Sequence, residues 1–176
     1  MANPNQSSEN PLREIRIAKV TLNIGAGKDE EMLKKGLKLL QKLSGEIKPV
    51  ATITQKRIPG WNLRPGLKIG CMVTIRKNTA ELLKRLLVAK ENKLSLNNFD
   101  NQGNFSFGIP EYIDIAGLEY DPDLKIMGLE VAVTLQRPGF RIKNRKIKKS
   151  AIGHSHLISK EEAVAFAQSR LQVEVQ

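Results

Sequence analysis

Polar side chains in three segments of this sequence have the types and the spacing that RNA binding requires. In each segment they alternate with apolar residues, and we call them the polar strand residues. They are Thr21, Asn23, Thr52, Thr54, Lys56, Thr74 and Arg76. Hydroxyl, amide and basic groups contact phosphates, ribose 2′-hydroxyls and base edges. A solvated sheet rich in threonine would give the same pattern, but the basic residues beside these segments favour the RNA interpretation.

Basic residues gather in two windows without acids. Residues 47–80 and 131–160 contain no Asp or Glu but hold 15 of the 29 Lys and Arg residues. In the first window, the Pro- and Gly-bearing segment 56–66 predicts a projecting loop. The candidate contacts in and after this loop are Arg57, Trp61, Asn62, Arg64 and Lys68. The sequence leaves open whether Trp61 stacks on RNA or packs within the loop.

The second window contains a basic arm. Its members are Arg137, Arg141, Lys143, Arg145, Lys146, Lys148 and Lys149. Because an ordinary soluble surface intersperses both signs of charge, this segregation indicates one electropositive face. Aromatic residues make up 5% of the chain, which is few for a protein that stacks successive unpaired bases. We therefore expect a folded RNA as the partner.

The segment Gly25-Ala26-Gly27-Lys28 follows a predicted strand but does not match a nucleotide-binding loop. The Walker pattern requires a further glycine upstream and a Ser or Thr after the lysine, where this chain has Asp29. The dinucleotide-binding pattern fails as well, and the acids at positions 29–31 would repel a phosphate. We interpret the segment as a turn between a strand and a helix.

No catalytic or metal centre is predicted, and no cofactor is expected. His154 and His156 have no third ligand close in sequence, whereas zinc needs at least three protein ligands. Cys71 occupies an inward strand position, and Asp121 and Asp123 flank a proline that favours a turn. An RNA-processing or nucleotide-using enzyme is the alternative. It would need a carboxylate cluster near the basic face, and the acids avoid that face.

The composition fits one globular domain. The chain has 176 residues, 40% of them hydrophobic, and a formal net charge of +11. Residues 1–11 predict a flexible tail, and residues 12–176 one domain with sequence halves of about 12–66 and 67–176. With no signal peptide and no apolar run of ~20 residues, we expect a cytoplasmic protein with a polyanionic partner and no membrane. A peripheral membrane protein is a weaker alternative, because a basic amphipathic helix with bulky anchors is lacking.

Hydrophobic periodicity predicts an α+β fold, with a mostly antiparallel sheet and helices packed on one face. Strands are expected at residues 15–24, 50–55, 67–76, 112–118 and 129–136. In the second of these, Ile53 is expected to face inward and Thr54 outward. One helix is expected from residue 29, and two more after capping boxes. The boxes are Asn78 with Glu81 and Ser159 with Glu162.

Several motifs in this sequence resemble one known family. In order along residues 12–176, they are VTLNIGAG, KRIPGWNLRPGLKIG, CMVTIR, GNFSFGIPEYI, GLEYDP and GLEVAVTLQRPGFR. They resemble the family of universal large-subunit ribosomal protein five, which binds 5S ribosomal RNA (5S rRNA). The extension RPGFRIKNRKIKK and the closing helix resemble the archaeal type of this family.

The resemblance implies a non-enzymatic protein in the central protuberance of the large ribosomal subunit. At matching positions, Asn23, Thr54, Thr74 and Arg76 would grip the 5S rRNA, and the loop at 56–68 would reach the P-site transfer RNA (tRNA). The resemblance also implies contacts with large-subunit rRNA, with universal large-subunit protein eighteen and with a small-subunit head protein. Residues 90–98 depart from the family's basic Pro-Arg-containing stretch, so no RNA contact is carried over to them.

Overall fold

A five-stranded antiparallel sheet forms the centre of the computed structural model, which describes residues 10–176. In spatial order its strands are β2 (Val50–Ile53), β3 (Lys68–Ile75), β1 (Arg16–Gly25), β6 (Leu129–Gln136) and β5 (Phe105–Ile109). Residues 1–9 of the predicted tail at 1–11 lie outside the described residues. Asn10 caps a short 3-10 turn, Pro11–Arg13, that leads into β1. The predicted α+β class with a mostly antiparallel sheet is confirmed.

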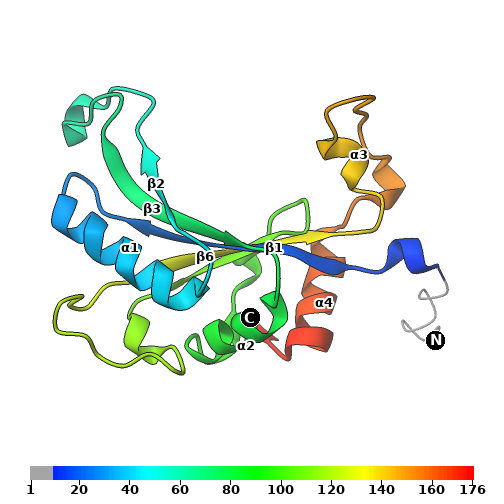
Figure 1. Ribbon diagram of the computed structural model, residues 1–176. Helices are drawn as coiled ribbons and strands as arrows, with labels where there is room; N and C mark the ends of the chain where they lie inside the picture. Colours follow the sequence, from blue (N-terminus) through cyan, green and yellow to red (C-terminus); the bar gives the residue numbers. More distant parts are fainter. Residues whose placement is uncertain (1–9) are drawn as a thin grey trace.

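Helices cover one face of this sheet, also as predicted (Figure 1). They are α1 (Glu30–Ser44), α2 (Thr79–Val88) and α4 (Lys160–Leu171). Helix α4 begins with the predicted capping box, in which the hydroxyl of Ser159 and the carboxylate of Glu162 each accept from the other's backbone N–H. After α4, strand β7 (Glu174–Val175) pairs in parallel with β4 (Lys93–Leu94). Segment 90–98, which departs from the family pattern, thus supplies the strand that pairs with β7.

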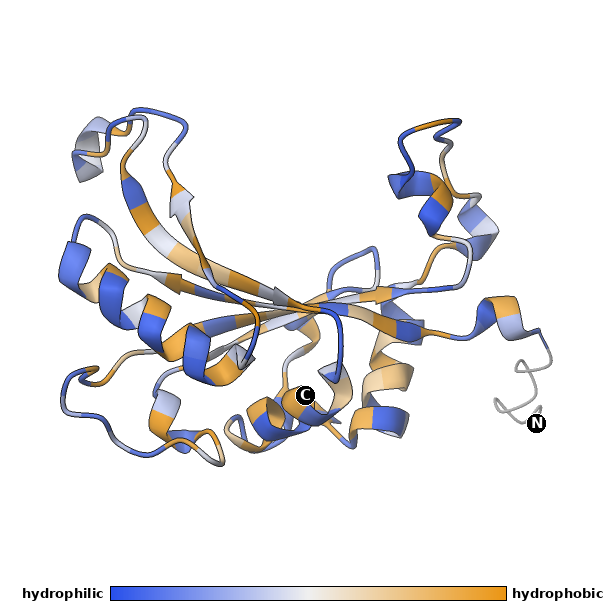
Figure 2. Ribbon diagram, viewed as in Figure 1, coloured by the Kyte–Doolittle hydropathy of each residue, from blue (hydrophilic) through white to orange (hydrophobic). Residues whose placement is uncertain are grey.

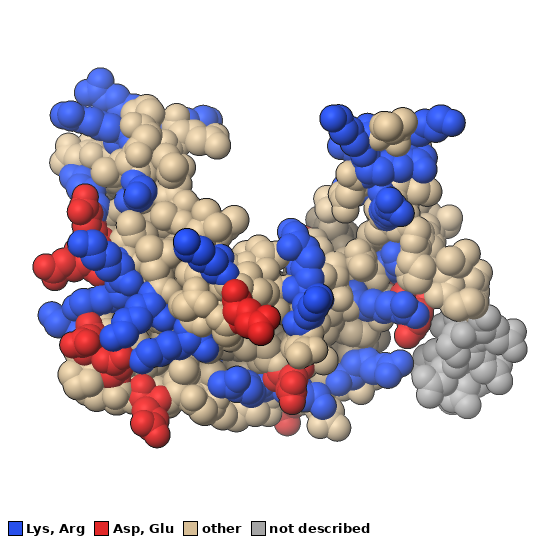
Figure 3. Space-filling model, viewed as in Figure 1, with Lys and Arg blue, Asp and Glu red and all other residues tan. Residues whose placement is uncertain are grey.

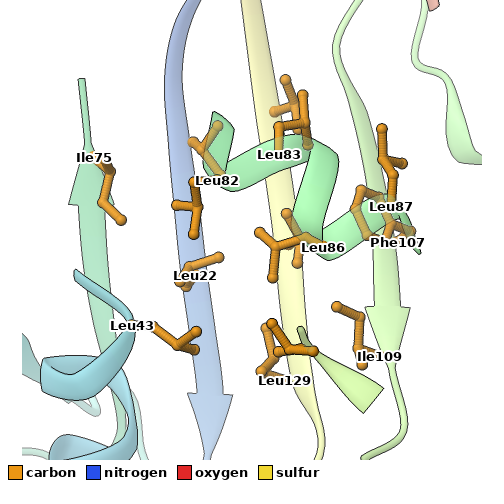
Figure 4. Close-up of a cluster of buried hydrophobic side chains, with 14 of the residues drawn as sticks. Leu22, Leu43, Ile75, Leu82, Leu83, Leu86, Leu87, Phe107, Ile109 and Leu129 are labelled. Atoms are coloured by element: carbon orange, nitrogen blue, oxygen red, sulfur yellow. The ribbon is translucent and has the colours of Figure 1, made fainter. Parts of the chain in front are cut away.

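The hydrophobic core fills the space between the helices and the sheet. Val20, Leu22 and Ile24 of β1 are buried, whereas Thr21 and Asn23 between them are only half-buried and face the other way. Four leucines of α2 pack onto the strands, and Figure 4 shows Leu82, Leu83, Leu86 and Leu87. Figure 2 shows the same segregation along α1, whose two sides differ in hydropathy. Each such leucine contributes about 1.5–3 kcal/mol when fully buried.

Helix α1 packs closely against β3 at Gly36. A Cβ atom at this position would lie 2.8 Å from the Sγ atom of Cys71. Cys71 is fully buried, and burial raises the pKa of its thiol to about 11. Because the thiolate is the nucleophilic form, this cysteine is a core residue and not a reactive one, as predicted.

Two of the expected local elements are wrong. Residues 112–118 form no strand, and Tyr112–Asp114 is a 3-10 helix. The fifth strand of the sheet is instead β5, which precedes this segment in the chain. The apolar side chains of this segment anchor a loop instead, and the hydroxyl of Tyr112 accepts from the backbone N–H of Asp121 at 3.0 Å. Before α2, Asn78 has a φ of 52° and its side chain makes no capping hydrogen bond. Asparagine tolerates this left-handed conformation, so the chain turns there without a capping box.

A register shift between β2 and β3 reverses the predicted orientation of Ile53 and Thr54. Thr52 pairs with Gly70 of β3, but Ile53 pairs with Lys68, so the register shifts by one residue. Because side chains alternate with a period of two, the shift turns Ile53 outward, 56% exposed, and Thr54 inward, 6% exposed. The hydroxyl of Thr54 donates to the backbone carbonyl of the residue before β3 at 3.2 Å. The assignment of Thr54 to the polar face is therefore corrected.

Two projections rise from the side of the sheet opposite the helices (Figure 1). One is the loop between β2 and β3, and the other is the arm at residues 137–153, which includes α3 (Arg141–Asn144). Figure 3 shows basic atoms at the ends of both projections. The fold thus places both predicted basic segments on the same side of the molecule as the polar strand residues.

Candidate RNA-binding interface

The sheet surface between the two projections carries most of the polar strand residues, and we call it the open sheet face. Thr21 lies opposite Thr74 on β3, and Asn23 lies opposite Glu130 on β6. The helices cover the other side of these strands, so alternation directs these side chains away from the core. Of the predicted residues, the open sheet face brings together Thr21, Asn23, Thr52, Thr74 and Arg76. Lys56 is exposed in the loop after β2, beyond the sheet itself.

A groove joins the open sheet face to the basic arm. It has a volume of about 430 Å³, and its lining includes Arg76 of the sheet end and Lys143 of the arm. Lys19 also lines it and lies opposite Thr134 on β6. Sequence reasoning missed Lys19, although it alternates in step with Thr21 and Asn23. Three cations from three separate segments therefore surround one groove.

One acid lies on the open sheet face, contrary to the expectation that acids avoid it. Glu130 is exposed on β6, and its carboxylate accepts from the Asn23 amide at 3.1 Å. The sequence alone does not place Glu130 beside Asn23, because distance along the chain does not show which strands become neighbours. Pairing of β1 with β6 brings it beside Asn23.

The loop between β2 and β3 is held in a defined shape. Ile58 and Leu63 exchange two backbone hydrogen bonds of 3.1 Å, and Leu63 is 7% exposed. A 3-10 turn, Pro59–Trp61, follows Ile58 and leaves the Trp61 side chain 70% exposed. Trp61 therefore does not pack within its own loop.

Basic residues line a second groove beside this loop. Its volume is about 370 Å³ and its lining includes Lys28, Arg57, Asn62 and Arg64. Lys28 comes from the turn after β1, which was predicted to be a strand-to-helix connection. That prediction is confirmed, since the Asp29 carboxylate caps α1 by accepting from the N–H groups of Glu31 and Met32. Lys68 is exposed and lies opposite Ile53, between the loop and the sheet.

Arg137 is not an exposed member of the basic arm, and its assignment there is corrected. Its side chain is 4% exposed and donates to the carbonyls of Arg13 at 3.1 Å, Leu157 at 3.0 Å and His156 at 3.3 Å. It also pairs with Glu162 at 2.7 Å. Burial alone raises the pKa of Glu162, but hydrogen bonds from the α4 N-cap backbone and from Arg137 bring that pKa below its usual value. The five donors of a guanidinium suit this junction of three chain segments.

The rest of the arm is exposed. Its basic residues are Arg141, Lys143, Arg145, Lys146, Lys148 and Lys149. At the base of the arm, a ring nitrogen of His156 lies 2.9 Å from the Pro138 carbonyl, and its ring meets Phe140 edge-on with centroids 5.7 Å apart. His156 therefore contacts two residues at the base of the arm and stabilises it there. No group of three metal-ligating side chains occurs among residues 10–176.

Asp121 and Asp123 fasten a loop to α1. The Asp121 carboxylate lies 2.7 Å from the Lys42 ammonium and 3.3 Å from that of Lys38, which also lies 3.3 Å from Asp123. The Lys42 hydrogen bond, with help from Lys38, lowers the pKa of Asp121 to about 2. The pair holds a turn, as predicted.

Replacing Asp121 with Asn is expected to remove an acid-sensitive part of the stability. Because the folded-state pKa of Asp121 is about 2 instead of the usual 3.8, its contribution is complete above about pH 5 and is lost as the pH falls towards 2. Wild type should therefore lose more stability than Asp121→Asn over this range, measured as urea midpoints. Asp114→Asn, at an exposed site, is the control and should follow wild type. Parallel pH profiles for Asp121→Asn and wild type would contradict the assignment.

Within residues 10–176, no helix combines the length and the apolar character needed to cross a membrane.

Comparison with protein-family models gives two matches that divide the chain between them. Residues 10–64 match the family "Ribosomal protein L5", and residues 68–166 match the model that describes the C-terminus of the same ribosomal protein family. The first match contains β1, α1, β2 and most of the β2–β3 loop, and the second contains the remaining strands of the sheet and the basic arm.

Individual relatives match over almost their whole length. The chain is 48% identical over 169 residues to "Large ribosomal subunit protein uL5" of Nanoarchaeum equitans. The matched residues cover 95% of this chain and 99% of that protein. It is 44% identical over 168 residues to the protein of that name from Sulfurisphaera tokodaii, with 94% of each covered. It is 44% identical over 159 residues to the protein of that name from Nitrosopumilus maritimus, and the match covers 90% of this chain and 91% of that protein. The resemblance of the motifs is thus confirmed, and the chain belongs to the uL5 family of structural, non-enzymatic proteins of the large ribosomal subunit.

Proposed function

We propose that this chain binds 5S rRNA through the open sheet face and the groove that joins it to the basic arm. The observation that carries the proposal is the convergence of Lys19, Arg76 and Lys143 on one groove beside a row of hydroxyl and amide groups. Cations contact phosphates and supply affinity, whereas hydroxyls and amides can contact ribose and base edges and supply register. The exposed end of the arm would contact large-subunit rRNA.

The β2–β3 loop would contact the P-site tRNA. The support is an exposed tryptophan beside three arginine and lysine side chains on a loop whose shape is fixed by its own hydrogen bonds. A ring of this kind can stack on a base or a ribose while the cations pair with phosphates. Neighbouring ribosomal proteins of the central protuberance and a small-subunit head protein would contact the remaining surface.

Purified protein should bind a 5S rRNA transcript with a strong dependence on salt. If about six phosphates are contacted, a plot of log K against log salt should have a slope on the order of −4 to −5. Arg76→Ala and Thr74→Ala should each weaken binding and leave the fold intact, and Arg76→Ala should also make the slope shallower by about one. Filter binding across a salt series measures both quantities.

Lys84→Ala on the helix side of the sheet is the matched control, because it removes an exposed cation of α2 far from the open sheet face. It should leave the slope unchanged. A slope near zero for wild type, or equal binding of an unrelated duplex RNA, would overturn the proposal.

A double variant of the loop, Trp61→Ala with Arg64→Gln, should separate the two surfaces. It should leave 5S rRNA affinity within about twofold of wild type, because the loop tip lies outside the open sheet face. It should weaken P-site tRNA binding by ribosomes that carry it, measured with labelled tRNA, by about tenfold. Leu63 is retained so that the loop keeps its shape. Loss of 5S binding with normal tRNA binding would mean that the two surfaces are assigned the wrong way round.

A further inference from the structure

One row of residues crosses all five strands of the open sheet face. In strand order from β2 to β5, the row is Val50, Met72, Asn23, Glu130 and Gly108. Its centre is the hydrogen-bonded pair of Asn23 and Glu130, and neither end of the row is charged. Such a row is an unusual binding surface for a phosphate, because its centre carries a negative charge.

The pair presents donors and acceptors side by side. The Asn23 amide donates one hydrogen to Glu130 at 3.1 Å and has a second N–H and a carbonyl oxygen. An ionised carboxylate has about four acceptor sites. Among residues 10–176, Asn23 is the only hydrogen-bond partner of the Glu130 side chain. The carboxylate therefore retains acceptor capacity on a surface that faces the RNA.

We propose that Asn23 and Glu130 form a binding site for one unpaired guanine of the RNA. The inference rests on the proposed function of the open sheet face. Guanine is the RNA base whose Watson–Crick edge places two donors, N1–H and N2–H, beside an acceptor, O6. The carboxylate of Glu130 would accept from both donors, and the second amide hydrogen of Asn23 would donate to O6. Adenine, cytosine and uracil each offer the carboxylate only one such donor, flanked by an acceptor that it repels.

The surroundings of the pair suit the ring of a base. On one side, the side chains of Val50 and Met72 are 62% and 40% exposed, which is costly on a surface that only meets phosphates. A thioether packs favourably against an aromatic ring. On the other side, Gly108 leaves open space, since a Cβ atom there would meet nothing within 4 Å. A groove of about 570 Å³ lies beside this part of the row, and its lining includes Asn23, Gly108, Glu130 and one cation, Lys90.

The variant Glu130→Gln tests this inference, because the change in RNA affinity should have opposite signs under the two interpretations of Glu130. If Glu130 only repels phosphates, removing its charge should strengthen RNA binding, as any loss of an acid from such a surface does. If it binds guanine, the variant should weaken binding of the 5S rRNA transcript about tenfold or more, because the glutamine cannot accept from both donors. Binding that is unchanged or tighter in Glu130→Gln would overturn the inference.

Two further measurements make the assignment specific. Inosine lacks the N2 amino group of guanine. Replacing guanine with inosine at one position of the transcript should therefore weaken binding by the wild-type protein, and the same replacement should have no further effect on binding by Glu130→Gln. Gly108→Val should also weaken binding, since it fills the open space with a residue that strands accept. Glu119→Gln, at an exposed site in a loop next to Leu39 and Lys42 of α1, is the charge-matched control and should bind as wild type does. Inosine interference that persists in Glu130→Gln would refute the site, whereas absence of 5S binding by wild type would instead refute the proposed function.

Discussion

Arg137→Ala should lower the free energy of unfolding by about 3 kcal/mol, a larger effect than any exposed arginine of the arm can have. Alanine removes four polar contacts at once and leaves the carbonyls of Arg13, His156 and Leu157 without this donor. Breaking a buried ion pair costs about 3–5 kcal/mol, and we take the lower end because the Glu162 side chain is 42% exposed and can be solvated. Guanidinium chloride unfolding measures the change.

Two variants make this result specific. Arg141→Ala removes an exposed guanidinium four residues away and should change stability by no more than about 0.5 kcal/mol. Arg137→Lys keeps the charge but lacks the planar fork that reaches three carbonyls, so it should resemble Arg137→Ala more than wild type. If Arg137→Ala and Arg141→Ala were equally stable, the contacts of Arg137 at the buried junction would contribute nothing measurable to stability.

The second large effect is expected from the groove between the open sheet face and the arm. The triple variant Lys19→Gln, Arg76→Gln and Lys143→Gln should weaken 5S rRNA binding on the order of 10²–10³-fold at moderate salt. Each lost charge-assisted contact is worth about 1.5 kcal/mol, and each 1.4 kcal/mol is tenfold in affinity. The slope of log K against log salt should also become shallower by about 2–3, because fewer counterions are released.

A triple variant with the same charge change separates local contact from net charge. Lys34→Gln, Lys84→Gln and Lys125→Gln removes three exposed lysines outside the open sheet face, two on the helices and one in the loop that precedes β6. Its binding should stay within about threefold of wild type, since exposed charges beyond a Debye length are largely screened. Equal losses in the two triple variants would mean that net charge alone drives binding and that the groove has no special role.

The comparison of sequence and structure shows which predictions local physics supports. The strand at 15–24 and the capping box of Ser159 and Glu162 were predictable, because alternation and capping depend on residues close together in the chain. The open sheet face followed from the same alternation. Where it failed, at Ile53 and Thr54, the cause was a register shift in the pairing with β3. A single strand read on its own contains no information about its partner's register.

Residues 112–118 illustrate a second limit. Alternating apolar side chains there resemble a strand, yet they anchor a loop under α1 by way of Tyr112 and the ion pairs of Asp121. In the structure the buried side chains are Tyr112 and Ile115, which lie three residues apart, so the burial does not follow the alternation that the sequence suggests. The sheet ends at β5, and residues 112–118 do not pair with it.

By itself, the sequence determined the fold class, the core-facing positions of most strands, the two basic segments and the family. These follow from composition, periodicity and motif order, which are local properties of the chain. Only the tertiary structure decided that Arg137 is buried, that Lys19 and Lys143 share a groove with Arg76, and that Glu130 meets Asn23. Each of these depends on contacts between residues distant in sequence, and their geometry is set by packing of the whole sheet.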